Sequence, residues 1–199
     1  MTEDFIIPLE NYLKVGLHIG TKFRTKYMAP FIFKIRNDGL AVLDVKKIDE
    51  RIDIAANFLS RFDPHEILVL CRRENGWDAA KLFAKKTGIN VIAGRYRPGL
   101  LTNSNLEDFL NNIKVIFVVD PWPDKNAIRD AYSVGIPIIA LCDTNNESNY
   151  IDLVVPCNNK GKKSLALIFW VLTKEYLKRR GHLKKDEDFK LTLEDFSPN

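Results

Sequence analysis

The sequence predicts an α/β domain in which a mostly parallel sheet is covered by helices on both faces. Two observations carry this prediction. Short strand segments alternate with amphipathic helical segments along the chain, and the strand segments are apolar throughout. The 199 residues, 46% of them hydrophobic, are enough to bury a core. We expect a single α/β domain over residues 1–185 and an acidic, flexible tail over residues 186–199.

The N-terminal part of the chain combines positive charge with a turn signal. Residues 11–37 hold six Lys and Arg and no acidic residue. Two apolar runs, Phe31–Ile35 and Leu40–Leu43, flank an Asn37-Asp38-Gly39 turn, which is typical of a β-hairpin. We therefore expect an N-terminal β-hairpin segment in addition to the main sheet.

The rest of the chain alternates helices and strands. Ser104 and Glu107 form a capping-box pattern that predicts a helix over residues 106–113, and Asp124 is expected to cap a later helix. Asp63 precedes a proline and so ends the helix before it. The remaining predicted elements are helices over residues 46–62, 78–86, 124–134 and 164–180 and strands over residues 67–71, 90–92, 115–119, 136–141 and 153–155, with Gly88, Gly135 and Gly181 at helix ends.

Composition and motifs exclude several functions. The chain has 30 Lys and Arg against 26 Asp and Glu, a net charge of +4 that permits a nucleic-acid partner without requiring one. Cys71, Cys142 and Cys157 lack the spacing of a disulfide framework or a zinc site, which favours a reducing, cytosolic compartment. No signal peptide and no apolar run of about 18 residues is present, so no membrane partner is expected. No glycine-rich phosphate motif predicts a nucleotide cofactor.

Two aspartates leave an alternative open. Asp120 and Asp143 each follow a predicted strand, and the carboxyl ends of parallel strands meet at one edge of a sheet. There the two carboxylates could serve as acid and base or bind a metal ion. The simpler interpretation, which we favour, is that each accepts hydrogen bonds within its own turn. A small-molecule-binding protein or enzyme that uses this edge is the alternative function, and an adaptor that binds proteins through the acidic tail is a third.

Local clusters of positive charge are the strongest functional signal. Residues 22–27 and 95–97 interleave cations with aromatic rings, and residues 160–185 hold nine Lys and Arg against one acid. Cations neutralise phosphates, and aromatic rings stack on unpaired bases. The sequence therefore predicts an RNA-facing surface, with candidate contacts at Lys22, Arg24, Lys26, Arg95, Arg97, Lys160, Lys162, Lys163, Arg179 and Arg180.

Four segments of the chain resemble the universal S-two family of small-subunit ribosomal proteins, in the order in which that family has them. The Arg-Pro-Gly and Pro-Cys-Asn-Asn-Lys-Gly forms resemble its archaeal and eukaryotic branch. The resembling segments are YLKVGLHIGT at residues 12–21, GRYRPGLLTN at residues 94–103, residues 118–121 with residues 135–145, and PCNNKGKKSL at residues 156–165.

The resemblance implies a three-layer, flavodoxin-like α/β fold with no cofactor, no small-molecule substrate and no catalysis. It implies a structural constituent of the small ribosomal subunit in the cytoplasm, which supports subunit assembly and translation. Its partners would be ribosomal RNA and neighbouring ribosomal proteins, near the junction of head and body on the solvent side. Beside the first cations, the small residues of the Gly16–Gly20 turn are expected to let the backbone approach RNA closely.

Overall fold

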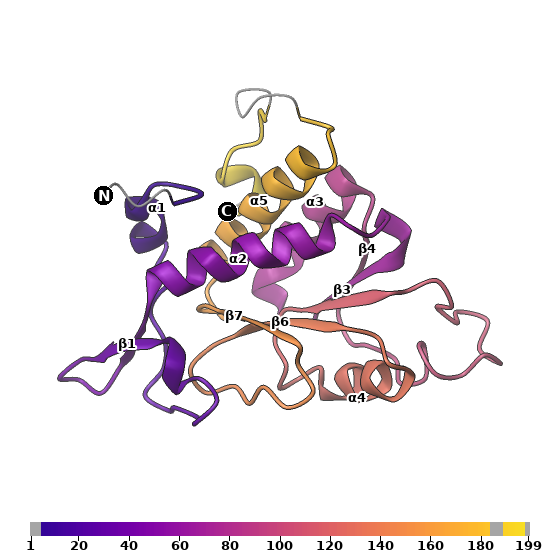
Figure 1. The fold of residues 1–199 in the computed structure, drawn as a ribbon, viewed down its shortest axis with the longest axis horizontal. Coiled ribbons are helices and arrows are strands. Elements are labelled where there is room, and N and C mark those ends of the chain that lie inside the picture. Colours follow the sequence, from indigo (N-terminus) through magenta and orange to yellow (C-terminus); the bar gives the residue numbers. More distant parts are fainter. Residues whose placement is uncertain (1–4, 184–188, 198–199) are drawn as a thin grey trace.

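The computed structural model describes residues 5–183 and 189–197, and its centre is a five-stranded parallel sheet (Figure 1). The strand order is β4-β3-β5-β6-β7, so the order reverses between β3 and β5, as in flavodoxin-like folds. A separate antiparallel hairpin pairs β1 with β2. The strands are β1 (Ile32–Ile35), β2 (Ala41–Leu43), β3 (Ile67–Cys71), β4 (Asn90–Ala93), β5 (Val115–Val118), β6 (Ile138–Cys142) and β7 (Leu153–Pro156). Both the α/β prediction and the hairpin are confirmed.

Helices cover both faces of the sheet and complete three layers (Figure 1). Because successive strand residues point to opposite faces, Val69 of β3 packs under α2, α3 and α5, whereas Leu70 packs on the side of α4. The helices are α1 (Leu9–Lys14), α2 (Val45–Leu59), α3 (Trp77–Thr87), α4 (Lys125–Val134) and α5 (Lys162–Arg179), with 3-10 turns at η1 (Ala29–Phe31), η2 (Pro64–Glu66), η3 (Glu74–Gly76) and η5 (Glu194–Phe196).

Helix ends follow the expected signals. α3 and α4 stop at Gly88 and Gly135, whose φ angles of 77° and 74° lie in the left-handed region that suits glycine. Gly181, with φ of 76°, follows the C-cap of α5. α2 ends at Leu59, slightly before the position expected from Asp63.

One predicted helix does not form. Between β4 and β5 the chain makes a series of turns, in which the Leu110 amide donates to the Leu100 carbonyl at 2.8 Å. That amide is therefore withdrawn from the Leu106 carbonyl, which it would bond in a helix. The Asn103 side chain also accepts from the Asn105 amide at 3.0 Å, a local bond that competes with helix formation. The capping-box prediction at residues 104–107 is wrong, and the segment covers the sheet without helical structure.

The C-terminal segment 189–197 packs against the body of the protein. The Trp170 indole nitrogen donates to the Leu191 carbonyl at 2.8 Å, and the Phe196 ring is buried in the core beside α3 and α5. The expectation of a flexible tail is therefore wrong for residues 189–197. The other residues of that tail, 186–188 and 198–199, lie outside the described residues.

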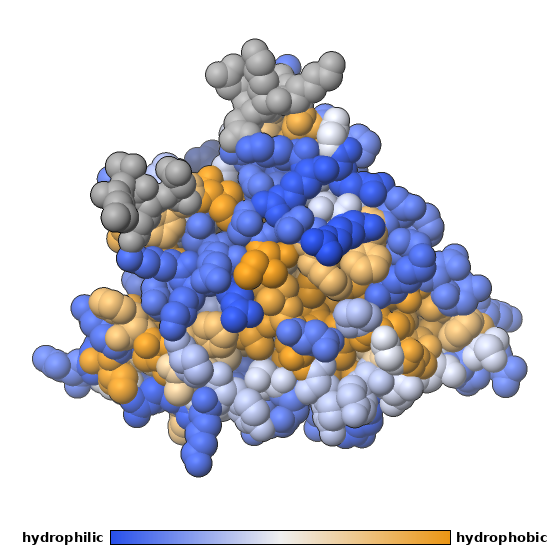
Figure 2. Space-filling model, viewed as in Figure 1, coloured by the Kyte–Doolittle hydropathy of each residue, from blue (hydrophilic) through white to orange (hydrophobic). Residues whose placement is uncertain are grey.

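Apolar side chains remain on the surface in two places. Figure 2 shows one such area over the free edge formed by β7, between α2 and α4, and another at the hairpin that projects from the body. Phe33 and Ile35 of the hairpin are exposed. Among the described residues, no helix has both the length and the apolar character of a membrane span.

Candidate nucleic-acid interface

The basic N-terminal segment is fixed to the carboxyl edge of the sheet. The Thr21 amide donates to the Thr144 hydroxyl at 2.9 Å, and the Thr25 amide donates to the Thr144 carbonyl at 3.0 Å. The Thr25 hydroxyl donates to the Asn146 carbonyl at 2.7 Å. The segment therefore forms a rim along the connection between β6 and β7.

Three of the predicted contact residues lie on this rim with their charges exposed. Lys22, Arg24 and Lys26 alternate with the threonines that hold the segment, and none forms an ion pair with another described residue. Since no carboxylate neutralises them, their charges are available to phosphate groups.

Gly20 serves the fold and not a close approach to RNA. A Cβ atom at this position would lie 2.4 Å from Cγ2 of Thr144 and 3.1 Å from the Ala41 carbonyl oxygen. The backbone must therefore come close to β2 and to Thr144, which is an internal contact. For Gly20, the structure gives a packing reason in place of the one expected from the sequence.

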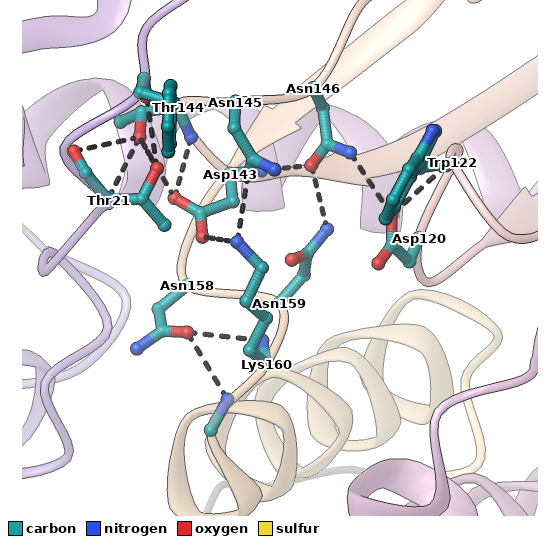
Figure 3. A network of polar contacts seen from close by, with 12 residues as sticks. Thr21, Asp120, Trp122, Asp143, Thr144, Asn145, Asn146, Asn158, Asn159 and Lys160 are labelled. Carbon is teal, nitrogen blue, oxygen red and sulfur yellow. Dashed lines mark hydrogen bonds and ion pairs between the residues drawn. The ribbon is translucent and has the colours of Figure 1, made fainter.

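Asp143 lies at the end of β6 and is held by Lys160 (Figure 3). The Lys160 ammonium donates to Oδ2 of Asp143 at 2.7 Å and to Oδ1 of Asn145 at 2.8 Å. The other carboxylate oxygen of Asp143 accepts from the Thr144 amide at 2.6 Å. Because Asp143 is buried, Lys160 neutralises a charge that would otherwise be costly to bury.

Asp120, at the end of β5, is equally occupied by partners within the chain. Its Oδ2 accepts from Nε of Arg73 at 2.6 Å, and its Oδ1 accepts from the Trp122 amide and from the Asn146 side chain, both at 3.1 Å (Figure 3). The simpler interpretation of Asp120 and Asp143 as turn acceptors is confirmed. The alternative site at this edge has no carboxylate oxygen free of internal donors.

The last predicted group of contacts is largely paired within the fold. Arg179 of α5 donates to the Asp53 carbonyl at 3.0 Å, forms an ion pair with the Asp53 carboxylate, and lies 3.4 Å from Oε2 of Glu175. Arg180 donates to Asp63 at 2.7 Å. In the same group, Lys163 is exposed in the first turn of α5 and Lys162 is partly buried.

The central loop holds its aromatic ring inside the molecule. The Tyr96 hydroxyl donates to Oδ2 of Asp130 at 3.0 Å, and burial beside that carboxylate raises the pKa of the Tyr96 phenol. Tyr96 therefore anchors the loop and is not available to stack on a base. Arg95 is exposed, and Arg97 lies 3.5 Å from Asp108 in an exposed pair.

Sequence reasoning missed a groove beside the rim. A cavity of about 640 Å³ opens between the rim, the start of α4 and the connection that follows β6; its lining includes Phe23, Arg24, Trp122, Lys125, Arg129 and Tyr150. Lys125 and Arg129 are four residues apart on α4, a spacing that places two cations on one helix face. That spacing was the available signal, but the sequence does not show that this face lies opposite residues 23–25.

Asp124 begins α4 but does not cap it with its side chain. Its Oδ2 is buried and has no hydrogen-bond partner among the described residues. Burial raises the pKa of this carboxyl to about 6, because the charged form loses its hydration. The capping prediction is therefore right for the position of Asp124 and wrong for its hydrogen bond.

The fold and the site define a class of protein: an α/β scaffold whose sheet edge is filled by its own side chains and whose surface carries cations without internal partners. Comparison with known sequences gives the family. The family model described as "Ribosomal protein S2" matches residues 12–114 and 104–178, and the chain belongs to this family. The resemblance found in the sequence is confirmed.

Archaeal relatives match nearly the whole chain, and each is named small ribosomal subunit protein uS2. The protein of Nanoarchaeum equitans is 50% identical over 193 residues, which cover 97% of this chain and 96% of that protein. The protein of Thermoplasma acidophilum is 48% identical over 196 residues, 98% of both chains. The protein of Pyrobaculum aerophilum is 46% identical over 198 residues, 98% of this chain and 95% of that protein.

Proposed function

We propose that this protein is a structural constituent of the small ribosomal subunit in the cytoplasm, where it binds ribosomal RNA and neighbouring ribosomal proteins and supports assembly and translation. The observation that carries the proposal is family membership, with about half of the residues identical to uS2 proteins over almost the full length. The role is one of structure and not of catalysis.

The RNA contacts are proposed from the exposed cations. Lys22, Arg24 and Lys26 on the rim form one contact, and Arg95 and Arg97 on the central loop form another. Each can neutralise a phosphate without first breaking a buried ion pair.

The predicted contacts on and before α5 divide into two groups. Lys162 and Lys163 lie where the helix begins and are proposed as the third RNA contact. Lys160, Arg179 and Arg180 have carboxylate partners in the chain, and we propose that their main role is to hold the fold.

Neighbouring proteins are proposed to cover the apolar surface that the fold leaves open. The β7 strand has a free edge, and an uncovered edge strand can pair with another chain. The exposed Phe33 and Ile35 lie on the projecting hairpin, outside the main core. Apolar surface of this kind commonly marks protein contacts.

The alternative function at the sheet edge is not favoured, because it depends on two carboxylates that are already committed. Asp143 pairs with Lys160 and Asp120 pairs with Arg73. A small molecule or metal ion would have to displace these internal donors before it could bind.

The test is sedimentation of a cell lysate through sucrose gradients at low and at high salt, with detection of this protein. We expect it in the small-subunit and polysome fractions, with release into the upper fractions as salt rises, because its contacts with phosphate are electrostatic. A protein found only at the top of the low-salt gradient would refute the proposed function.

A further inference from the structure

The groove beside the rim is built from elements that are far apart in the chain. We call it the aromatic groove. Residues 23–25 form one wall, the start of α4 and the turn before it form the second, and residues 145–150 form the third. The Tyr27 hydroxyl donates to Oδ1 of Asn149 at 2.8 Å and closes the groove at one end. Its volume of about 640 Å³ lies within the range of small-ligand sites.

Large aromatic rings stand at the groove with most of their surface exposed. The exposed fraction is 81% for Phe23 and 77% for Trp122. The rings of Tyr132 and Tyr150 lie with their centres 4.3 Å apart, and both side chains are exposed. Exposed apolar residues scattered singly need no explanation, whereas several aromatic rings around one cavity indicate a binding surface.

The charged residues of the groove are mostly cations. Arg24 stands on one wall, and Lys125 and Arg129 stand on the other, while Glu147 is the acidic residue of the lining. Neither Lys125 nor Arg129 forms an ion pair with a described residue. This balance suits a polyanion, and flat rings between cations suit a polyanion that carries bases.

We propose that the aromatic groove binds unpaired nucleotides of a single-stranded RNA segment. The bases stack on Trp122 and Phe23, and the phosphates lie beside Arg24, Lys125 and Arg129. Stacking tolerates any base, so the groove selects unpaired RNA over duplex RNA more than it selects a sequence. The inference rests on the proposed function and deepens it, because it assigns one surface of the scaffold to one form of RNA.

The first test uses the full chain and a labelled, unstructured 12-nucleotide uridine-rich RNA, with binding followed by fluorescence anisotropy. Trp122→Ala combined with Phe23→Ala should weaken binding by about tenfold or more, as expected for the loss of base stacking. The matched control is Phe33→Ala, which removes an equally exposed ring outside the groove and should leave the affinity unchanged.

The salt dependence separates phosphate contact from stacking. Lys125→Ala with Arg129→Ala should lower the slope of log affinity against log salt by about 1.4, or about 0.7 for each phosphate on a single strand. The aromatic variant should keep the wild-type slope. An aromatic variant that binds as tightly as the wild type would overturn the proposal, and so would a duplex RNA that binds as tightly as the single strand.

The second test examines the groove inside the particle. Small subunits that contain the protein are irradiated at 254 nm, and peptides that include Trp122 are analysed by mass spectrometry. We expect these peptides linked to nucleotides. A photoreactive residue at position 122 that links only to another protein would overturn the RNA proposal in favour of a protein partner. Absence of the chain from small subunits would instead refute the proposed function, and the oligonucleotide result would still decide the chemistry of the groove.

Discussion

The two basic regions of this chain use their charge in opposite ways. On the rim, Lys22, Arg24 and Lys26 point outward and have no carboxylate partner among the described residues. At the two ends of α5, Lys160 and Arg179 pair with Asp143 and with Asp53 and Glu175. Both regions look alike in the sequence, as runs of Lys and Arg with few acids.

The difference shows that a run of cations does not identify an interface by itself. The partner of Arg179 lies 126 residues earlier in the chain, and the acids that pair with α5 come from other segments. What decides the role of a cation is whether the fold brings a carboxylate to it. The expectations below test this division, because paired cations should control stability and unpaired cations should control RNA binding.

The largest effect on stability is expected at Lys160. Lys160→Met leaves the buried Asp143 carboxylate without its cation and should lower the free energy of unfolding by about 3 kcal/mol. Urea denaturation measures this change. Lys163→Met, at an exposed position nearby, is the matched control and should change stability by less than about 0.5 kcal/mol. Adding Asp143→Asn to Lys160→Met should restore part of the loss, and a double variant no more stable than Lys160→Met would contradict the role given to this pair.

A buried carboxyl without a cation gives the reverse case. The pKa of Asp124 is about 6 in the fold, against about 3.9 when unfolded. Below about pH 4 both states hold the proton and the carboxyl has no effect on stability. As pH rises from 4 to 6 the unfolded state ionises first, so stability falls, and the loss is complete above pH 6.

Asp124→Asn should therefore raise the free energy of unfolding by about 2 kcal/mol at pH 8, and the gain should disappear near pH 4. Denaturation of both proteins at a series of pH values checks this expectation. A gain that is the same at every pH would show that the carboxyl does not titrate as its burial requires.

Charge reversal on the rim should affect binding and not folding. Arg24→Glu with Lys26→Glu removes two phosphate contacts and should weaken association with small subunits by about tenfold at moderate salt. Co-sedimentation at several salt concentrations measures the loss, while the melting temperature should stay unchanged. If the double variant sediments with small subunits as well as the wild type, the rim does not contact RNA.

The smallest effect is expected at a pair of the intermediate kind. Arg97 and Asp108 lie 3.5 Å apart, and their side chains are 62% and 73% exposed. Water screens such a pair, so Asp108→Asn should change the free energy of unfolding by less than about 0.5 kcal/mol. Because the substitution also frees Arg97, binding to RNA should not decrease. A larger loss of stability in thermal denaturation would place this pair with the structural cations.

Much of the fold could be read from the sequence, because its signals are local. All-apolar runs such as residues 67–71 predicted buried strands, and Gly88 and Gly135 marked the helix ends where they are found. The helix at residues 106–113 was wrongly expected because its capping pattern is also local, whereas the bond between Leu110 and Leu100 that replaces it is not.

The candidate site depends on contacts that no local pattern reports. The aromatic groove joins residues 23–25 to residues 121–129 and 145–150, and only the tertiary fold brings these segments together. The docking of Phe196 was missed for the same reason: a single aromatic ring among acids has no period, yet it fills a place beside α3 and α5. Family resemblance indicated the function but did not tell which cations are free.

The bonds that fix the rim also set the order in which this chain can finish folding. Leu17 accepts from the Asn158 amide at 2.8 Å, and Thr25 bonds to residues more than a hundred positions later. The rim is therefore synthesised among the first residues and fixed among the last, after residue 158 has left the ribosome that makes it. An incomplete chain carries the cations but cannot hold them along the sheet edge. The protein thus presents a finished surface for assembly only once nearly all of it has been translated.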